Sequence, residues 1–179
     1  VWEFWGVRRK SLIDMEPNVA HTHLAWLESK LPASSTFTLV TQNVDGLHRK
    51  AGSRNVLEIH GRLSRTRCSD PSCSFQPLEE DYSYDGTVPK CPVCGRNLRL
   101  DIVLFGEQLT LESHQAKVAL RDVDLFVAIG TSGTVVPASG FARSADYAGA
   151  RTVYLNAEPM DPPNPYFQEQ YIGKAEDLV

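Results

Sequence analysis

Two short segments hold all four cysteines of the chain: Cys68-Ser-Asp-Pro-Ser-Cys73 and Cys91-Pro-Val-Cys94. In each segment a short loop can bring two thiolates onto one metal ion, and Gly95 favours a tight turn after the second pair. The alternative is two disulfides, which would need an oxidising compartment, and no secretory signal is visible in the sequence. We therefore predict that the four thiolates bind one zinc ion. No coordination position is then left for water, so we expect the metal to be structural.

The composition places the chain among ordinary globular proteins. Its 179 residues, 42% of them hydrophobic and 22% charged, are enough to bury a core. The net charge of −4, with both signs mixed along the chain, argues against a nucleic-acid binder that uses a broad basic face. No segment approaches the ~18 consecutive apolar residues of a membrane span. We expect a monomer that binds neither nucleic acid nor membrane, located by default in the cytoplasm, or in mitochondria if its source is eukaryotic.

Short apolar runs alternate with helical patterns on both sides of the cysteine segments. The pattern predicts strands over residues 37–41, 56–60, 101–105, 125–130 and 151–156. It predicts helices over residues 1–13, 16–31, 109–120 and 137–148. The strand predicted over residues 125–130 is almost entirely apolar, which is typical of a central parallel strand covered on both faces. The alternation predicts an α/β fold with an open, mostly parallel sheet, which binds ligands beyond the carboxyl ends of its strands.

Polar loops follow three of the predicted strands. They contain Gln42, Asn43 and Asp45, then Gly130, Thr131 and Ser132, and finally Asn156 and Glu158. The second loop could hold a phosphate or a ribose hydroxyl at a helix start, and the acid of the third could bind ribose hydroxyls. Each loop taken alone is ordinary turn sequence. Their occurrence at the ends of three parallel strands predicts one shared ligand site.

Taken in order, these motifs resemble the sirtuins, a family of NAD-dependent protein deacylases. Besides the cysteine pairs, the resemblance is carried by Thr41-Gln-Asn-Val-Asp-Gly-Leu-His48, Glu58-Ile-His-Gly61, Val103-Leu-Phe-Gly-Glu107, Gly130-Thr-Ser132 and Asn156-Ala-Glu158. It covers nearly the whole chain. It implies a Rossmann-like large domain, formed by residues 33–62 and 101–179. It also implies a small domain, formed by a helical module (residues 1–32) and a zinc-ribbon module (residues 63–100).

By this resemblance, His60 is the general base of the reaction. An acyl-lysine carbonyl oxygen displaces nicotinamide from the ribose, and the imidazole then takes a proton from a ribose hydroxyl. A histidine suits this step because the unperturbed pKa of imidazole lies near neutral pH. The products would be free lysine, nicotinamide and an O-acyl-ADP-ribose. The alternative for a single histidine is a packing role in the core.

The resemblance also assigns contacts to the two substrates. The co-substrate NAD would contact Gln42, Asn43, Val44 and Asp45 at its nicotinamide end, Gly130, Thr131 and Ser132 at its phosphates and ribose, and Asn156, Ala157, Glu158 and Ala175 at its adenosine end. The acyl-lysine protein or peptide would lie as an added strand along Val103, Phe105, Gly106 and Glu107.

The N-terminal segment resembles the class III branch of the family, which prefers acidic acyl groups such as succinyl. That branch uses a tyrosine and an arginine three residues apart, which share one helix face. Arg8 matches the arginine and could bind a distal carboxylate through two hydrogen bonds. Trp5 stands in place of the tyrosine and lacks its hydroxyl. We expect deacetylation, desuccinylation or demalonylation, with Arg8 favouring the acidic groups; an ordinary solvated arginine is the alternative.

The family's first strand, with its Gly-Ala-Gly-type phosphate loop and arginine-bearing cofactor loop, has no counterpart in the sequence. We therefore expect these 179 residues alone to be inactive and to hold NAD poorly, while the parent protein is an enzyme. Two alternatives stay open. One is an ADP-ribosyltransferase or NAD hydrolase on the same fold, and the other is a zinc-ribbon interaction module without catalysis.

Overall fold

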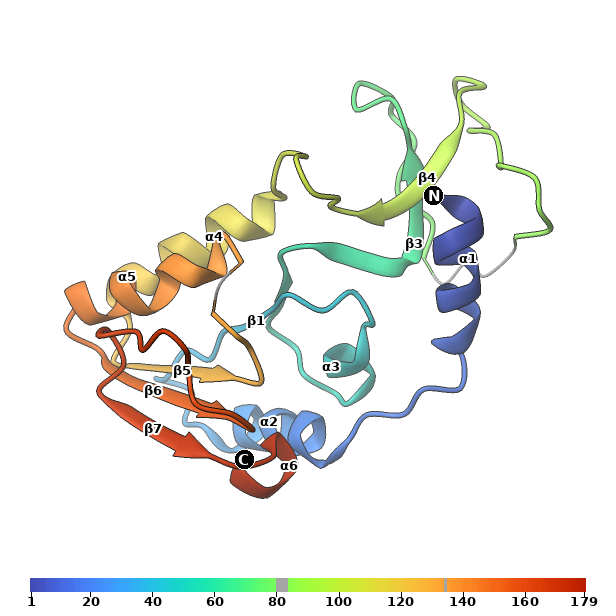
Figure 1. Cartoon of the computed structure of the whole chain (residues 1–179). Helices are drawn as coiled ribbons and strands as arrows, with labels where there is room; N and C mark the ends of the chain where they lie inside the picture. The colour runs from blue at the N-terminus through green and yellow to red at the C-terminus, as the bar shows by residue number, and fades with distance from the viewer. Residues whose placement is uncertain (80–83, 134) are drawn as a thin grey trace.

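The computed structural model describes residues 1–79, 84–133 and 135–179. Figure 1 shows two lobes. The small lobe contains α1 (Trp2–Ser11), the antiparallel pair β3 (Gly61–Cys68) and β4 (Leu98–Ile102), and the cysteine loops. The large lobe contains all other helices and strands. Its strands are β1 (Leu39–Thr41), β2 (Val56–Glu58), β5 (Leu125–Ile129), β6 (Arg151–Asn156) and β7 (Glu169–Ile172).

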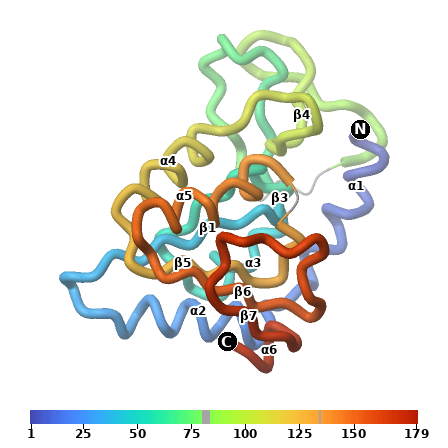
Figure 2. The backbone as a smooth tube through the Cα atoms, turned by 60° about the vertical axis from the view of Figure 1, so that its left-hand side comes forward, coloured from blue at the N-terminus to red at the C-terminus, as the bar shows by residue number. Residues whose placement is uncertain are grey.

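The helices of the large lobe are short and surround these strands. They are α2 (Val19–Lys30), α3 (Leu47–Lys50), α4 (Leu111–Ala119), α5 (Phe141–Tyr147) and α6 (Ala175–Leu178), with 3-10 turns η1 (Leu120–Asp122) and η2 (Ala138–Gly140). In Figures 1 and 2, α4 and α5 lie together on one side of the strands, while α2 and α6 lie together on the other. Within residues 1–79, 84–133 and 135–179, the structure contains no helix with the length and hydrophobicity of a transmembrane span.

The parallel α/β character predicted for the chain is confirmed, but the strands form two sheets. Strands β1 and β2 pair in parallel with each other, and β5, β6 and β7 form a second parallel sheet with β6 in the centre. The interpretation of β5 as a central, fully covered strand is wrong. Leu125 and Val127, which point to the same face, are 53% and 38% exposed. Strand β5 is an edge strand of its sheet, and this face of it is not covered.

The strand predicted over residues 101–105 is also misplaced. Strand β4 ends at Ile102 and pairs antiparallel with β3, so it belongs to the small lobe and not to a parallel sheet. The ladder stops where Gly61 faces Ile102, and the next residue, Val103, donates its N–H to the carbonyl oxygen of His60 at 2.9 Å. Residues 103–105 therefore continue as a loop.

Helix boundaries differ from the predicted ones for local reasons. Helix α2 begins after Asn18 and not at Pro17, because the Asn18 side chain accepts a hydrogen bond from the His21 N–H and the His21 ring closes the capping box. Strands β3 and β7 and helices α3 and α6 were not predicted. The sequences of β3 and β7 are mostly polar and lack the apolar alternation that identified the other strands. Helices α3 and α6 have four residues each, too few to show a helical period.

Each lobe has its own buried core. In the small lobe, α1 packs against the sheet through Trp2, whose indole N–H donates to the Leu98 carbonyl oxygen at 3.0 Å. In the large lobe, Ile59 of the segment after β2 packs against α4 and α5 through Ala116 and Phe141. His60 follows Ile59, so the predicted general base lies where the two lobes join. Helix α2, which the prediction grouped with the small domain, packs here against α3 and α6. The predicted domain bounds stay predictions.

Candidate functional site

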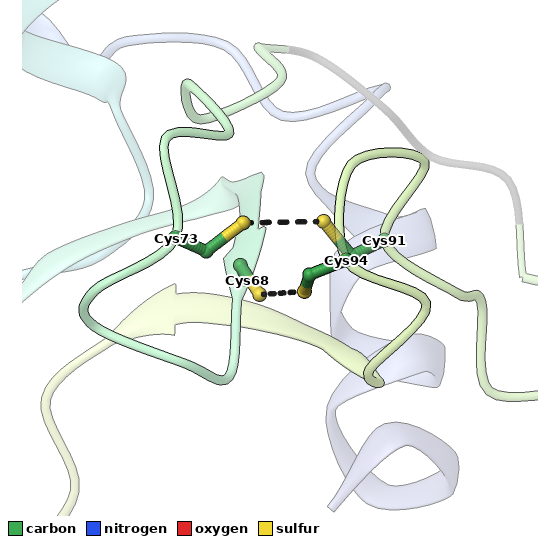
Figure 3. A group of neighbouring side chains, drawn as sticks. All are labelled: Cys68, Cys73, Cys91 and Cys94. Atoms are coloured by element: carbon green, nitrogen blue, oxygen red, sulfur yellow. Dashed lines mark hydrogen bonds between the residues drawn. The ribbon is translucent and has the colours of Figure 1, made fainter.

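The four cysteines form a compact cluster at the end of the small lobe. Their sulfur atoms all lie within 4.8 Å of one another, and Figure 3 shows the side chains converging from the end of β3, the loop after it and the loop before β4. The Sγ atoms of Cys68 and Cys94 are 3.5 Å apart, and those of Cys73 and Cys91 are 3.7 Å apart. A disulfide would require about 2.05 Å, so the disulfide alternative is wrong for this structure. Four sulfurs around zinc at about 2.3 Å lie about 3.8 Å apart, so the cluster fits one structural zinc ion.

His60 lies in the turn between β2 and β3, with one ring nitrogen already engaged. Its Nδ1 atom is 3.0 Å from the carbonyl oxygen of Gln42. A carbonyl oxygen can only accept, so Nδ1 must carry the proton of this hydrogen bond. In the neutral ring, Nε2 is then the unprotonated nitrogen with a free lone pair. The loop that follows β1 thus sets the tautomer that a general base needs.

The backbone around His60 is fixed on both sides. The Ile59 N–H donates to the Thr41 carbonyl oxygen at 3.2 Å. The Ile59 carbonyl oxygen accepts from the hydroxyls of Thr110 and Ser113, both at 3.2 Å, at the start of α4. The imidazole is therefore held by its ring nitrogen and by hydrogen bonds on the residue before it.

Gly61, directly after His60, allows the chain to turn there. Its φ of +80° lies in the left-handed region that favours glycine, and a Cβ atom at this position would lie 2.1 Å from the carbonyl oxygen of Asp101. Any other residue would push β4 away from the turn. The glycine of the Glu-Ile-His-Gly motif is thus required by close backbone approach.

Hydrogen bonds join the three predicted ligand loops. The Gln42 side chain donates to the hydroxyl of Thr131 at 3.1 Å, and the Tyr154 hydroxyl donates to the Thr131 carbonyl oxygen at 3.0 Å. The Asn156 amide donates to the Tyr154 hydroxyl at 2.7 Å. The structure therefore brings the carboxyl ends of β1, β5 and β6 together, as the sequence predicted. Tyr154 was missed, because it reads simply as an apolar strand residue.

The other predicted NAD residues lie in or beside these loops. Asp45 accepts from the Leu47 N–H at 2.9 Å at the start of α3, and the Val44 carbonyl oxygen accepts from Leu63 at 2.8 Å. Gly130 has a φ of +61° and donates its N–H to the Leu155 carbonyl oxygen. The remaining members are exposed or half-buried loop or helix-end residues: Asn43, Ser132, Ala157, Glu158 and Ala175. Their contacts with NAD stay predictions.

The predicted peptide-binding segment is a loop held by an ion pair. Phe105 is fully exposed at its tip, and Gly106 has a φ of +86°. The Glu107 carboxylate accepts from the Leu104 N–H at 2.9 Å and pairs with Arg99 of β4. The hydrogen bond from Arg99 is the main cause that lowers the pKa of Glu107 to about 2. Glu107 therefore shapes this loop, and the contacts of the loop with a peptide substrate stay predictions.

The two predicted acyl-selecting residues lie on α1. The Arg8 guanidinium lies 3.8 Å above the ring of Phe4 and 5.7 Å from that of Trp5. It also donates to the Phe4 carbonyl oxygen at 3.3 Å. Sequence reasoning missed its neighbour Arg9, which is 1% exposed and donates to the Ser64 carbonyl oxygen at 2.6 Å. Arg9 fixes α1 on β3, while the role of Arg8 stays a prediction.

Comparison with known proteins agrees with this arrangement. A sequence profile of the Sir2 family matches residues 1–137. The NAD-dependent protein deacylase SIR2rp3 of Leishmania major is 43% identical over 180 residues, which span 98% of this chain and 72% of the relative. An NAD-dependent protein deacylase of Pasteurella multocida is 43% identical over 184 residues, which span 100% of this chain and 75% of the relative.

Solved structures with a similar fold are also Sir2 proteins. A Sir2 homologue in complex with NAD superposes with a TM-score of 0.87 at 33% identity, covering 99% of this chain and 67% of its own. A mutant Sir2 homologue with 2′-O-acetyl ADP-ribose gives 0.85 at 33% identity, covering 99% and 69%. A Sir2 complex with a p53 peptide and NAD gives 0.78 at 26% identity, covering 94% and 69%. From the sequence and the structure alike, this chain belongs to the Sir2 family.

Proposed function

We propose that the protein is an NAD-dependent protein-lysine deacylase. The observation that carries the proposal is the geometry of His60, whose Nδ1 is held by the Gln42 carbonyl oxygen so that Nε2 is free to accept a proton. This nitrogen belongs to a ring beside the loop that follows β1, and hydrogen bonds connect that loop to the ends of β5 and β6. NAD supplies the ribose hydroxyl from which His60 would take a proton. Nicotinamide would leave the ribose, and the acyl group would be transferred from lysine to that ribose.

The residues at the strand ends fit the polar parts of NAD only in part. Hydroxyl, amide and carboxylate groups of Asn43, Asp45, Thr131 and Glu158 suit an amide and ribose hydroxyls. None of the eleven predicted NAD residues is a lysine or arginine that would neutralise a pyrophosphate. Weak NAD binding by these 179 residues alone thus stays our prediction.

The partners we propose are acylated proteins or peptides that bind along the loop containing Phe105. This side chain is fully exposed on the loop fixed by the Glu107–Arg99 ion pair, where a peptide strand could be added. The names of the relatives and the peptide complex of the Sir2 homologue support this class of partner. We also propose a monomer, a cytoplasmic location, no nucleic-acid partner, and a preference for acidic acyl groups through Arg8.

Replacement of the general base tests the proposal. We expect the full-length protein to convert acetyl- or succinyl-lysine peptides and NAD into free lysine, nicotinamide and O-acyl-ADP-ribose, identified by mass spectrometry. His60→Ala should lower the rate by about 10²–10⁴-fold, the usual contribution of a general base. His114→Ala, which changes an exposed histidine of α4, is the matched control and should keep the rate.

The products distinguish the alternatives. ADP-ribose formed without consumption of the acyl peptide would identify an NAD hydrolase, and ADP-ribose attached to protein would identify a transferase. A His60→Ala variant as active as the unmodified protein would refute the proposed role of His60. Comparison of the two peptides in the same assay decides the acyl preference.

A further inference from the structure

A buried carboxylate lies two residues before His60 and has no role in the chemistry described above. Glu58 is 1% exposed, at the end of β2. Its carboxylate accepts from Arg62, with Nε at 2.9 Å from Oε1 and Nη2 at 2.8 Å from Oε2, and from the Nε of Arg49 at 3.3 Å. A charge removed from water is costly unless it is paired and hydrogen-bonded. The Glu58 carboxylate is buried with two arginine partners, two residues before the proposed base.

Arg62 connects this carboxylate to both lobes. It is the second residue of β3, and its Nη1 donates to Glu79 of the small lobe at 2.8 Å. Its side-chain stem lies against Gly46, where an added Cβ atom would be 3.4 Å from the Cδ of Arg62. Gly46 follows the loop that carries Asn43 and Asp45. One guanidinium therefore fixes the turn at His60 relative to that loop and to the small lobe.

Arg49 connects the same carboxylate to α3. Its Nη2 donates to the Val56 carbonyl oxygen at 2.6 Å, so α3 is held against β2. Helix α3 begins directly after the same loop, at Leu47. Arg62 thus holds the start of β3, and Arg49 holds α3 against β2. The hydrogen bond from His60 Nδ1 to the Gln42 carbonyl oxygen requires that these elements stay in fixed positions relative to the His60 ring.

We propose that Glu58 and Arg62 are positioning residues that hold His60 in the orientation in which the Gln42 carbonyl oxygen fixes its tautomer. The pair joins residues 58 and 62, and so closes the turn that contains His60 and Gly61. This inference rests on the proposed function for its catalytic meaning, although the orientation of the ring can be measured without turnover. The competing explanation is a buried ion pair that only stabilises the fold.

The test compares this pair with a second Arg–Glu pair at the amino ends of β6 and β7, opposite the carboxyl end of β6 that precedes a predicted NAD loop. The variants are Glu58→Gln, which removes the charge and keeps the shape, and Arg62→Lys, which keeps the charge and removes the two-pronged hydrogen bonding. The matched control is Glu169→Gln, because Glu169 of β7 also accepts two hydrogen bonds from one arginine, Arg151 of β6. Thermal unfolding confirms which variants are folded at the assay temperature.

Nitrogen NMR of ¹⁵N-histidine-labelled full-length protein, with His60 assigned by a His60→Gln variant, reads the ring directly. We expect one neutral tautomer, protonated at Nδ1, in the unmodified protein and in Glu169→Gln. We expect a mixture of tautomers in Glu58→Gln and a smaller change in Arg62→Lys. A single Nδ1-protonated tautomer in both folded variants would overturn the proposal.

Turnover provides the second readout. We expect kcat for deacylation to fall about 10–100-fold in Glu58→Gln with little change in the KM for NAD, and Glu169→Gln to match the unmodified protein. Exchange of labelled nicotinamide, which precedes proton removal by His60, should fall less than deacylation. Equal losses in both reactions would contradict the positioning role. Absence of deacylation in the unmodified protein would refute the proposed function, and the NMR result would still decide the orientation of His60.

Discussion

In the small lobe, two predicted metal ligands are themselves core residues, whereas the core cluster described in the large lobe contains apolar side chains and no cysteine. Cys68 and Cys91 are buried in the same cluster as Trp2, Leu98 and Leu100. The large-lobe core consists of Ile59 and aliphatic and aromatic side chains from α4 and α5, and one face of β5 is exposed beside it. A small hydrophobic core is rarely sufficient on its own, and a structural metal is a common remedy. The two lobes should therefore respond differently to the same perturbation.

Removal of zinc should have the largest effect and should act on one lobe. Structural zinc sites in small peptides contribute about 10–16 kcal/mol of apparent binding free energy, most of which is folding free energy. We expect chelation, or Cys91→Ser, to abolish hydrogen-exchange protection in β3 and β4 while β6 keeps its protection. Hydrogen exchange read by mass spectrometry, with zinc added back to the chelated protein as the control, measures this. Equal loss of protection in β6 would show that the lobes do not fold independently.

The chemistry of both lobes was readable from the sequence where it depends on local spacing. The cysteine pairs lie five and three positions apart in sequence and were identified without any knowledge of the fold. The loops after β1, β5 and β6 were identified because each directly follows an apolar run. The resemblance to sirtuins then related these local signals to one another.

Features that depend on partners distant in sequence could not be predicted. Strand β4 was assigned to a parallel sheet, because its apolar residues do not reveal that β3 is its neighbour. Arg62 reads as an ordinary surface arginine, although its side chain is only 12% exposed and bonds Glu58 and Glu79. Glu58 belongs to the recognised motif, but its sequence position does not show that its carboxylate is buried and paired with Arg62.

Truncation of one leucine in each lobe should have an effect of intermediate size on the free energy of unfolding. Leu100 of β4 is 1% exposed in the small-lobe core, whereas Leu125 of β5 is 53% exposed. We expect Leu100→Ala to cost about 2–5 kcal/mol, as is usual for a leucine deleted from a packed core. Leu125→Ala should stay within about 1 kcal/mol, because little apolar surface is lost from a core. Urea unfolding at saturating zinc measures both, and equal costs would mean that the β5 face is covered in solution.

The smallest predicted effect concerns acid stability of the large lobe. His48 of α3 lies beside His21 of α2, with ring centroids 4.5 Å apart. Burial, and then the charge of His21, lower the pKa of His48 from 6.5 to about 4, although Asp45 and Glu58 act in the opposite direction. The unfolded chain therefore binds this proton first. The stabilising contribution is complete above about pH 6.5 and is lost as the pH falls toward about 4.

We expect this loss to reach about 1–2 kcal/mol, because the ring is partly solvated and the full shift overstates it. Urea unfolding at pH 7 and pH 5 should show a smaller acid loss in His48→Gln than in the unmodified protein, while the exposed His114→Gln should show no difference. Identical pH dependence in both variants would refute the assignment. Protonation of the zinc thiolates also destabilises the small lobe in acid, but His48→Gln leaves that part unchanged. The acid loss that remains in His48→Gln is therefore the combined contribution of the zinc thiolates and the other titratable groups.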